Sequence, residues 1–284
     1  MAAASDWRSL ISSSASDLAL NSAIRASAPP ARMGCRASTT RPSSQIRDSP
    51  ASSASPATTL RAVGPADGAS KAWAALPGPW QAAFRGAWVS WQAGSLAVGA
   101  AVAGPDGSLV TGRNALLEHD RSVTPLAGTL MAHAEMAALA RLPTGDYRGH
   151  ELYTTFEPCV MCASTIRIYR IGRVHYASPD PIWEGLQEAF AELPSMARRL
   201  PERHLLGGAL GVFGHALHLA AVWGRVDEHE WVIEQHAQCA PREVGVARRL
   251  LEDGRLDRWG AEGRSVEEVV AALWSELSET AATP

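Results

Sequence analysis

The chain has 284 residues, which is enough for one large domain or two small ones with a buried core. Its 26 basic and 29 acidic residues give a net charge of -3, which argues against a protein whose main partner is nucleic acid. The four cysteines are too few for a disulfide-framed secreted scaffold. Two of them form a Cys-x-x-Cys pair, which is typical of metal or redox chemistry in a reducing compartment, so we expect a cytoplasmic protein.

Residues 1–72 differ in composition from the rest of the chain. They contain 16 serines and six prolines but no glutamate. No apolar period is long enough to bury a face, so this segment is expected to be a disordered N-terminal tail. An Arg- and Ser-rich, acid-poor start is also typical of organelle transit peptides, and an over-extended start site is a third interpretation. The segment lacks the apolar core of a secretory signal.

Residues 73–192 alternate between helical and extended patterns. Helices are predicted over 79–94, 130–141, 158–170 and 183–193, and strands over 96–103, 108–112, 151–155 and 173–177, with a polar loop over 113–129. This alternation predicts an α/β sandwich with a partly parallel sheet. No convincing fifth strand follows the last of these helices.

Residues 193–284 read as a mostly helical C-terminal region of unknown role. A capping box over 265–268 opens a helix with one apolar face. The stretch 205–223 is uncharged and just long enough to span a membrane. His215, His218 and four glycines would be costly in lipid, so we expect a buried core helix and no membrane partner.

Four residues in two short motifs carry the chemistry. His133 precedes Glu135 by two residues, and Cys159 and Cys162 are spaced i, i+3 at the start of a predicted helix. Helix N-termini favour negative charge, which keeps thiolates deprotonated. One His and two Cys leave a fourth position open, as in a catalytic zinc site, and Glu135 would reach that position without being a ligand. A thioredoxin-type redox pair is the competing interpretation, but it explains neither His133 nor Glu135.

The combined pattern His-x-Glu…Pro-Cys-x-x-Cys resembles the zinc-dependent cytidine and deoxycytidylate deaminase superfamily. The run 152–162 (LYTTFEPCVMC) is most similar to the branch of tRNA-adenosine, guanine and cytosine deaminases. The resemblance covers roughly residues 80–192 and implies a three-layer α/β/α sandwich with a mixed sheet, here with a helical C-terminal extension. It implies Zn²⁺ held by His133, Cys159 and Cys162, with Glu135 as proton shuttle.

The same resemblance implies that Asn114 and Ala134 bind substrate. Trp183 is a further candidate for the pocket, because it follows the carboxyl end of a predicted strand, where ligands bind in open α/β sheets. The histidines of the C-terminal region (His215 with His218, or His236 with Cys239) are weak metal candidates, because neither pair has a second half.

The expected function is hydrolytic deamination of a small nucleobase, nucleoside or nucleotide, with release of ammonia. Net negative charge in residues 73–192 (8 Arg against 11 acidic residues) makes a nucleic-acid partner the less favoured reading. The alternatives are an RNA-editing tRNA-adenosine deaminase and a non-catalytic interaction protein with the same fold. The resemblance also implies a homodimer.

Overall fold

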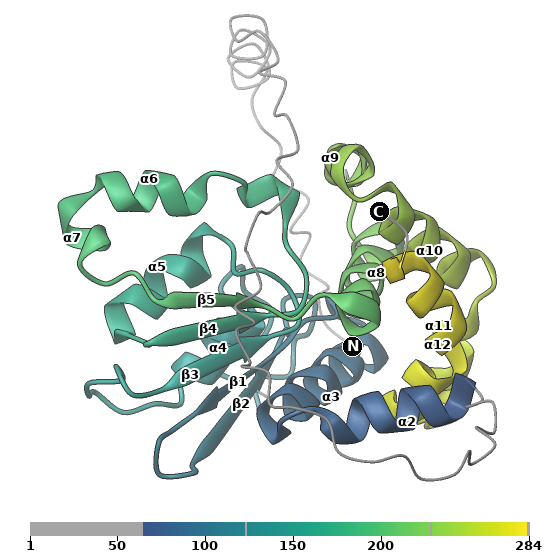
Figure 1. The fold of residues 1–284 in the computed structure, drawn as a ribbon, viewed down its shortest axis with the longest axis horizontal. Helices are drawn as coiled ribbons and strands as arrows, with labels where there is room; N and C mark the ends of the chain where they lie inside the picture. The colour runs from purple at the N-terminus through teal and green to yellow at the C-terminus, as the bar shows by residue number, and fades with distance from the viewer. Residues whose placement is uncertain (1–64, 123, 228, 283–284) are drawn as a thin grey trace, which may run out of the picture. The chain divides into compact units, whose positions relative to one another are not determined.

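The computed structural model describes residues 65–122, 124–227 and 229–282. The helices are α2 (Pro65–Ala75), α3 (Gly78–Gln92), α4 (Ala134–Leu139), α5 (Val160–Tyr169), α6 (Leu186–Glu192), α7 (Pro194–Ala197), α8 (Gly208–Arg225), α9 (Glu230–Cys239), α10 (Pro241–Glu252), α11 (Arg255–Ala261) and α12 (Val266–Ala282). The strands are β1 (Gly99–Ala103), β2 (Leu109–Arg113), β3 (Glu151–Thr154), β4 (Arg173–Tyr176) and β5 (Glu202–Leu205), and a short 3-10 turn, η2, spans Pro181–Trp183 (Figure 1).

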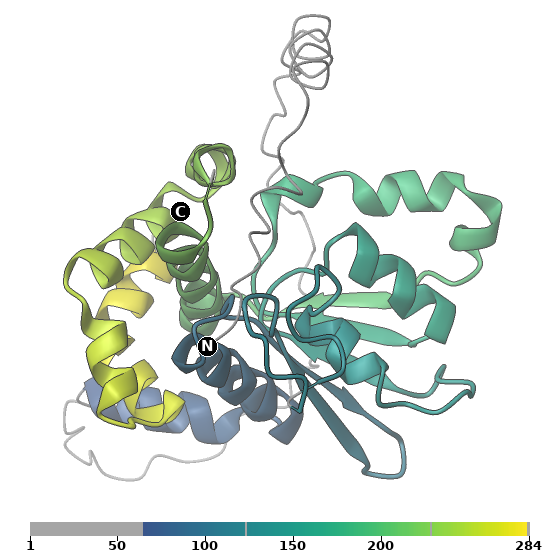
Figure 2. The same cartoon turned by 180° about the vertical axis from the view of Figure 1, so that it is seen from behind.

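The five strands form one mixed sheet in the order β2-β1-β3-β4-β5. Strand β1 runs antiparallel to both β2 and β3, whereas β3, β4 and β5 are mutually parallel. Helix α3 lies on one face, and α4 and α5 lie on the other (Figures 1 and 2). The arrangement confirms the expected three-layer α/β/α sandwich with a mixed sheet.

Two glycines let these helices approach the sheet closely. A Cβ at Gly99 would lie 2.0 Å from Ala83 O of α3, and one at Gly112 would lie 2.2 Å from Ala134 O of α4. Gly112 pairs with Ala100, the neighbour of Gly99 on β1, so the two glycines face opposite sides of the sheet. Small residues at these positions therefore bring α3 and α4 against the strands.

Strand β5 corrects the expectation that no fifth strand follows the helix at 183–193. It pairs in parallel with β4, from Arg173 opposite Glu202 to Tyr176 opposite Leu205. It is a four-residue edge strand whose side chains are mostly exposed. Short, charged edge strands carry no alternating apolar pattern, so the sequence gives no signal for them. The sheet consequently extends beyond the domain boundary expected at residue 192.

Helix α2 corrects the expectation that residues 65–72 are disordered. Ala69 and Trp73, spaced i, i+4, are buried in the same core as the C-terminal helices. Gly68 lies against Trp274 of α12, where a Cβ would be 2.9 Å from Nε1. An Ala-rich helix has little amphipathic signal of its own and is stabilised by this packing. The rest of the expected tail, residues 1–64, lies outside the described residues.

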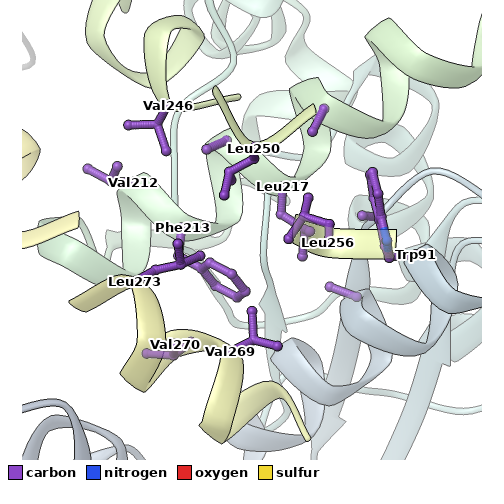
Figure 3. Close-up of a cluster of buried hydrophobic side chains, with 14 of the residues drawn as sticks. Trp91, Val212, Phe213, Leu217, Val246, Leu250, Leu256, Val269, Val270 and Leu273 are labelled. Carbon is purple, nitrogen blue, oxygen red and sulfur yellow. The ribbon is translucent and has the colours of Figure 1, made fainter. Parts of the chain in front are cut away.

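The C-terminal region is helical, as expected, and forms a second hydrophobic core with α2 and α3. Phe213 and Leu217 of α8 point toward Leu250, Leu256 and the apolar face of α12 (Figure 3). The capping box is present, because Ser265 N donates to Glu268 Oε2 at 2.8 Å and Glu268 N donates to Ser265 Oγ at 3.3 Å. Among the helices of the described residues, none is both long and apolar enough to cross a membrane.

Helix α8 also touches the carboxyl ends of the strands. A Cβ at Gly211 would lie 2.6 Å from Ala177 O, and one at Gly214 would lie 2.6 Å from Thr155 O. Thr155 follows β3 and Ala177 follows β4. The C-terminal helices are thereby fixed beside the end of the sheet at which the two cysteines emerge.

Candidate metal centre

Both sequence motifs lie at helix N-termini. His133 is the N-cap of α4 and has an extended backbone (φ -72°, ψ 154°), and Cys159 is the N-cap of α5 (φ -63°, ψ 173°). Each helix begins after a loop, and Cys162 lies one turn into α5. The close contact of α4 with Gly112 fixes the first turn of α4 against β2.

The three expected metal ligands converge. Nδ1 of His133 lies 3.6 Å from Sγ of Cys159 and 3.5 Å from Sγ of Cys162. The three ligand atoms all lie within 4.8 Å of one another. Zn–S bonds of 2.3 Å and Zn–N bonds of 2.0–2.1 Å at tetrahedral angles place a nitrogen and a sulfur about 3.6 Å apart. The imidazole and thiol donors therefore fit a zinc ion in both chemistry and spacing.

The two sulfurs are electrostatically unequal when no metal lies between them. The hydrogen bond from Cys162 lowers the pKa of the Cys159 thiol to about 4, and the same bond raises the pKa of Cys162. A metal ion would be held by both sulfurs as thiolates, the form that ligates zinc.

Glu135 lies beside this group but is not part of it. Its side chain is buried, Thr154 Oγ1 donates to Oε1 at 3.0 Å, and Cys162 Sγ donates to Oε2 at 3.4 Å. Burial raises the pKa of the Glu135 carboxyl, and the neighbouring His133 opposes that rise. The carboxylate is held by the protein at the edge of the donor set, which is the place for a proton-transferring group.

The three residues expected to bind substrate differ in burial and in hydrogen bonding. Ala134 is fully buried directly after His133. Asn114 follows β2 and is 2% exposed, and its Oδ1 accepts hydrogen bonds from Ser95 Oγ (2.9 Å) and Leu116 N (3.0 Å). Trp183 is half-buried at the end of η2. The roles of these three residues in binding substrate remain predictions.

The sequence did not indicate that histidines of the C-terminal region lie beside this centre. Phe156, three residues before Cys159, has ring centroids at 5.3 Å from His215, 4.3 Å from His218 and 6.0 Å from His236. These residues are about 60 to 80 positions apart in the chain, and no motif joins them. Only the packing of α8 and α9 against the end of β3 reveals the cluster.

Comparisons with known proteins agree with this site. The family model "Cytidine and deoxycytidylate deaminase zinc-binding region" matches residues 80–178. The tRNA-specific adenosine deaminase of Agrobacterium fabrum is 46% identical over 54 residues, 18% of this chain and 36% of that protein. The enzyme of the same name from Aquifex aeolicus is 40% identical over 63 residues, 21% of this chain and 42% of that protein. The matched segment thus spans about two fifths of these relatives.

Two solved structures are also similar. One comes from a study of A-to-I editing by tRNA:A34 deaminases; it is 27% identical, with 44% of this chain and 94% of that chain covered and a TM-score of 0.35. The other is guanine deaminase from Bacillus subtilis, 27% identical, with coverage of 39% and 67% and a TM-score of 0.31. The family model covers both motifs of the metal centre, so residues 80–178 of this chain are similar to the zinc-binding region of cytidine and deoxycytidylate deaminases.

Proposed function

We propose that this protein is a zinc-dependent hydrolytic deaminase that acts on a small nucleobase, nucleoside or nucleotide and releases ammonia. The observation that carries the proposal is the convergence of His133, Cys159 and Cys162 with Glu135 held beside them. Three ligands leave one position of a tetrahedral metal open, which is the arrangement of catalytic rather than structural zinc. Zinc at such a site supplies a Lewis acid that activates water near neutral pH.

Glu135 is the proton carrier in this proposal. It accepts a proton from the attacking water, delivers it to the ring nitrogen, and later protonates the departing amine. A C–O bond forms at the amine-bearing ring carbon, the C–N bond breaks, and ammonia leaves. The hydrogen bond from Thr154 fixes one carboxylate oxygen, so the other faces the metal ligands.

Substrate would lie between the metal centre and the loops that follow β2 and β4. The Oδ1 of Asn114 is occupied within the protein, so its amide NH₂ is the group available to donate to a ring acceptor. The backbone of Ala134 lies next to a metal ligand, and the Trp183 ring would supply an aromatic surface for a planar base.

The ion pairs that the arginines make within the chain favour a small substrate over a nucleic acid. Several of them pair with carboxylates of the same chain: Arg85 with Glu267, Arg113 with Glu118, Arg148 with Asp146, Arg173 with Glu151, and Arg203 with Glu157. Paired arginines contribute little net charge for neutralising phosphates, which dominate nucleic-acid affinity.

A second candidate is deamination of adenosine in tRNA. It is favoured by the names of the relatives, both of which are tRNA-specific adenosine deaminases. A non-catalytic role is disfavoured, because the complete donor set and Glu135 are all in place.

The proposal is tested by measuring ammonia release from the full-length, zinc-loaded chain. The substrates are a panel of amino-substituted bases, nucleosides and nucleotides, and a tRNA anticodon stem-loop. We expect turnover of at least one small molecule, with little dependence on salt. If only the RNA is deaminated, and its turnover falls steeply as the salt concentration rises, the substrate is tRNA and not a small molecule. If no compound in the small-molecule panel and no RNA releases ammonia, the proposed activity is contradicted.

A further inference from the structure

A buried chain of polar side chains joins the C-terminal helices to the segment after β4. Ser178 Oγ lies 2.8 Å from His215 Nδ1, and His215 Nε2 lies 2.8 Å from His236 Nδ1. His236 Nε2 then faces Asp180 Oδ1 at 3.5 Å. This last contact is longer than a hydrogen bond, and Nε2 is buried with no hydrogen-bond partner among the described residues. All four residues are buried.

The spacing excludes a metal between the two histidines. Two imidazole nitrogens on one tetrahedral zinc lie about 3.3 Å apart, given Zn–N bonds of 2.0–2.1 Å. The 2.8 Å between His215 and His236 is instead the length of a hydrogen bond. Among the described residues, the group of three or more possible metal ligands is His133 with Cys159 and Cys162, so the candidate pairs His215 with His218 and His236 with Cys239 gain no further ligand there.

Both histidines are neutral donor–acceptor relays. Burial lowers the pKa of His215 well below its usual value and that of His236 to about 4. A neutral imidazole has one donor and one acceptor, so all the contacts run in one direction. Burial also raises the pKa of Asp180 to about 7. The two hydrogen bonds can run from Ser178 through His215 to His236, which leaves the Nε2–H of His236 facing an ionised Asp180, or in the reverse direction, which leaves the Nε2 lone pair facing a protonated Asp180.

Asp180 connects this chain to the wall of the metal centre. Its Oδ1 accepts from Ile182 N at 3.0 Å and caps η2, the turn that ends at Trp183. Its backbone N–H donates to Glu157 Oε2 at 2.9 Å, and Glu157 lies two residues before Cys159. The η2 turn is thus held between the cysteine loop and the histidines of α8 and α9.

We propose that His215 and His236 are positioning residues for substrate binding: they fix Asp180, and through it the η2 turn with Trp183, beside the metal centre. The C-terminal helices then support the surface that would contact the substrate, whereas the metal ligands all lie within residues 80–178, the segment that the family model matches. The inference rests on the proposed function, because it assigns Trp183 to the surface that meets the base.

The test uses the full-length chain with three changes in the network. His236→Leu removes both polar nitrogens, whereas His236→Gln keeps one acceptor and one donor. Ser178→Ala is the mildest change and removes only the hydroxyl at the end of the hydrogen-bonded network. Gln238→Ala, at an exposed position of α9, is the matched control. Each variant is measured for bound zinc, for KM and kcat on the substrate found in the panel, and for hydrogen exchange at the amides of Ile182 and Trp183.

We expect His236→Leu to raise KM about tenfold, the factor that one lost hydrogen bond represents, with kcat changed by less than about threefold. Bound zinc is retained, exchange at Ile182 and Trp183 becomes faster, and exchange within α5 is unchanged. His236→Gln restores KM, Ser178→Ala gives a smaller change in the same direction, and Gln238→Ala matches the wild type.

Unchanged KM and exchange in His236→Leu would overturn the inference, as would loss of zinc from both His236 variants. If His236→Leu does not fold, wild-type KM and exchange in Ser178→Ala would overturn it equally. The exchange measurement needs no substrate. A chain that deaminates nothing but shows the faster exchange refutes the proposed function while the positioning of η2 stands.

Discussion

At Gly112, strand β2 is in close contact with α4, the helix that carries Glu135. A Cβ at this residue would lie 2.2 Å from Ala134 O and 2.4 Å from Ala138 N, and real Cβ atoms essentially never show contacts under 3.0 Å. Gly112→Ala therefore requires α4 to move away from the sheet by roughly 1 Å to reach van der Waals distance. His133 and Glu135 lie at the start of α4, so both move with it.

The expected cost has two parts. Overpacking of this kind destabilises a fold by about 3 kcal/mol. For a chain of this size, that loss lowers the melting temperature by roughly 6 to 12 °C. A displacement of about 1 Å at a catalytic group lowers kcat by about 100-fold. Zinc affinity also falls, because one of the three ligands shifts relative to the other two.

The assay compares Gly112→Ala with two matched glycine variants. Gly99→Ala forces a similar clash with α3, which carries no metal ligand, and Gly78→Ala meets no atom within 4 Å. Melting temperature, zinc retention against a chelator and kcat are measured for all three. We expect Gly99→Ala to lose stability with a smaller loss of kcat, and Gly78→Ala to match the wild type. Wild-type stability and turnover in Gly112→Ala would show that the contact of Gly112 with α4 does not fix the position of His133 and Glu135.

Three further predictions concern the metal, a helix cap and pH. Cys159→Ala should lose zinc and melt at a lower temperature, because metal binding is coupled to folding; full zinc occupancy by elemental analysis would contradict its role as a ligand. Ser265→Ala should cost about 1 kcal/mol in denaturant unfolding without changing turnover, because it removes only the capping box of α12; an unchanged midpoint would contradict the cap. Burial lowers the pKa of His218 to about 3, below its value near 6.5 in the unfolded chain. The folding free energy that depends on neutral His218 is therefore fully present above pH 6.5 and is lost as the pH falls below that value. Urea unfolding of the wild type should lose about 2 kcal/mol more than His218→Phe between pH 6.5 and pH 5, and parallel losses would contradict the buried, neutral state of His218.

The metal centre could be predicted because each half of it is local in sequence. His133 with Glu135, and Cys159 with Cys162, are each brought together by a single helix turn, and the α/β pattern brings the two helix starts to one end of the sheet. The hydrophobic periods likewise predicted α3, β1 to β4 and the mainly helical C-terminal region.

The parts that could not be predicted depend on long-range contacts. Strand β5 is charged and exposed, and it is a strand because β4 offers it an edge. Helix α2 has little apolar pattern and is fixed by Trp274 and the core around it. The histidines of α8 and α9 carry no motif, and their contact with Asp180 exists only once three separate segments have packed.

In the proposed mechanism, a zinc ion on His133, Cys159 and Cys162 acts together with a non-ligating Glu135 in hydrolytic deamination. The most direct test is Glu135→Gln, which preserves shape and removes the proton-accepting carboxylate. Bound zinc and ammonia release are measured on the same preparation, beside the wild type. We predict about one zinc per chain, as expected for a three-ligand site, and kcat lowered by a factor of about 10² to 10⁴, the usual contribution of a general acid–base group. Turnover near the wild-type rate, or loss of the zinc, would contradict the role of Glu135 and with it the mechanism.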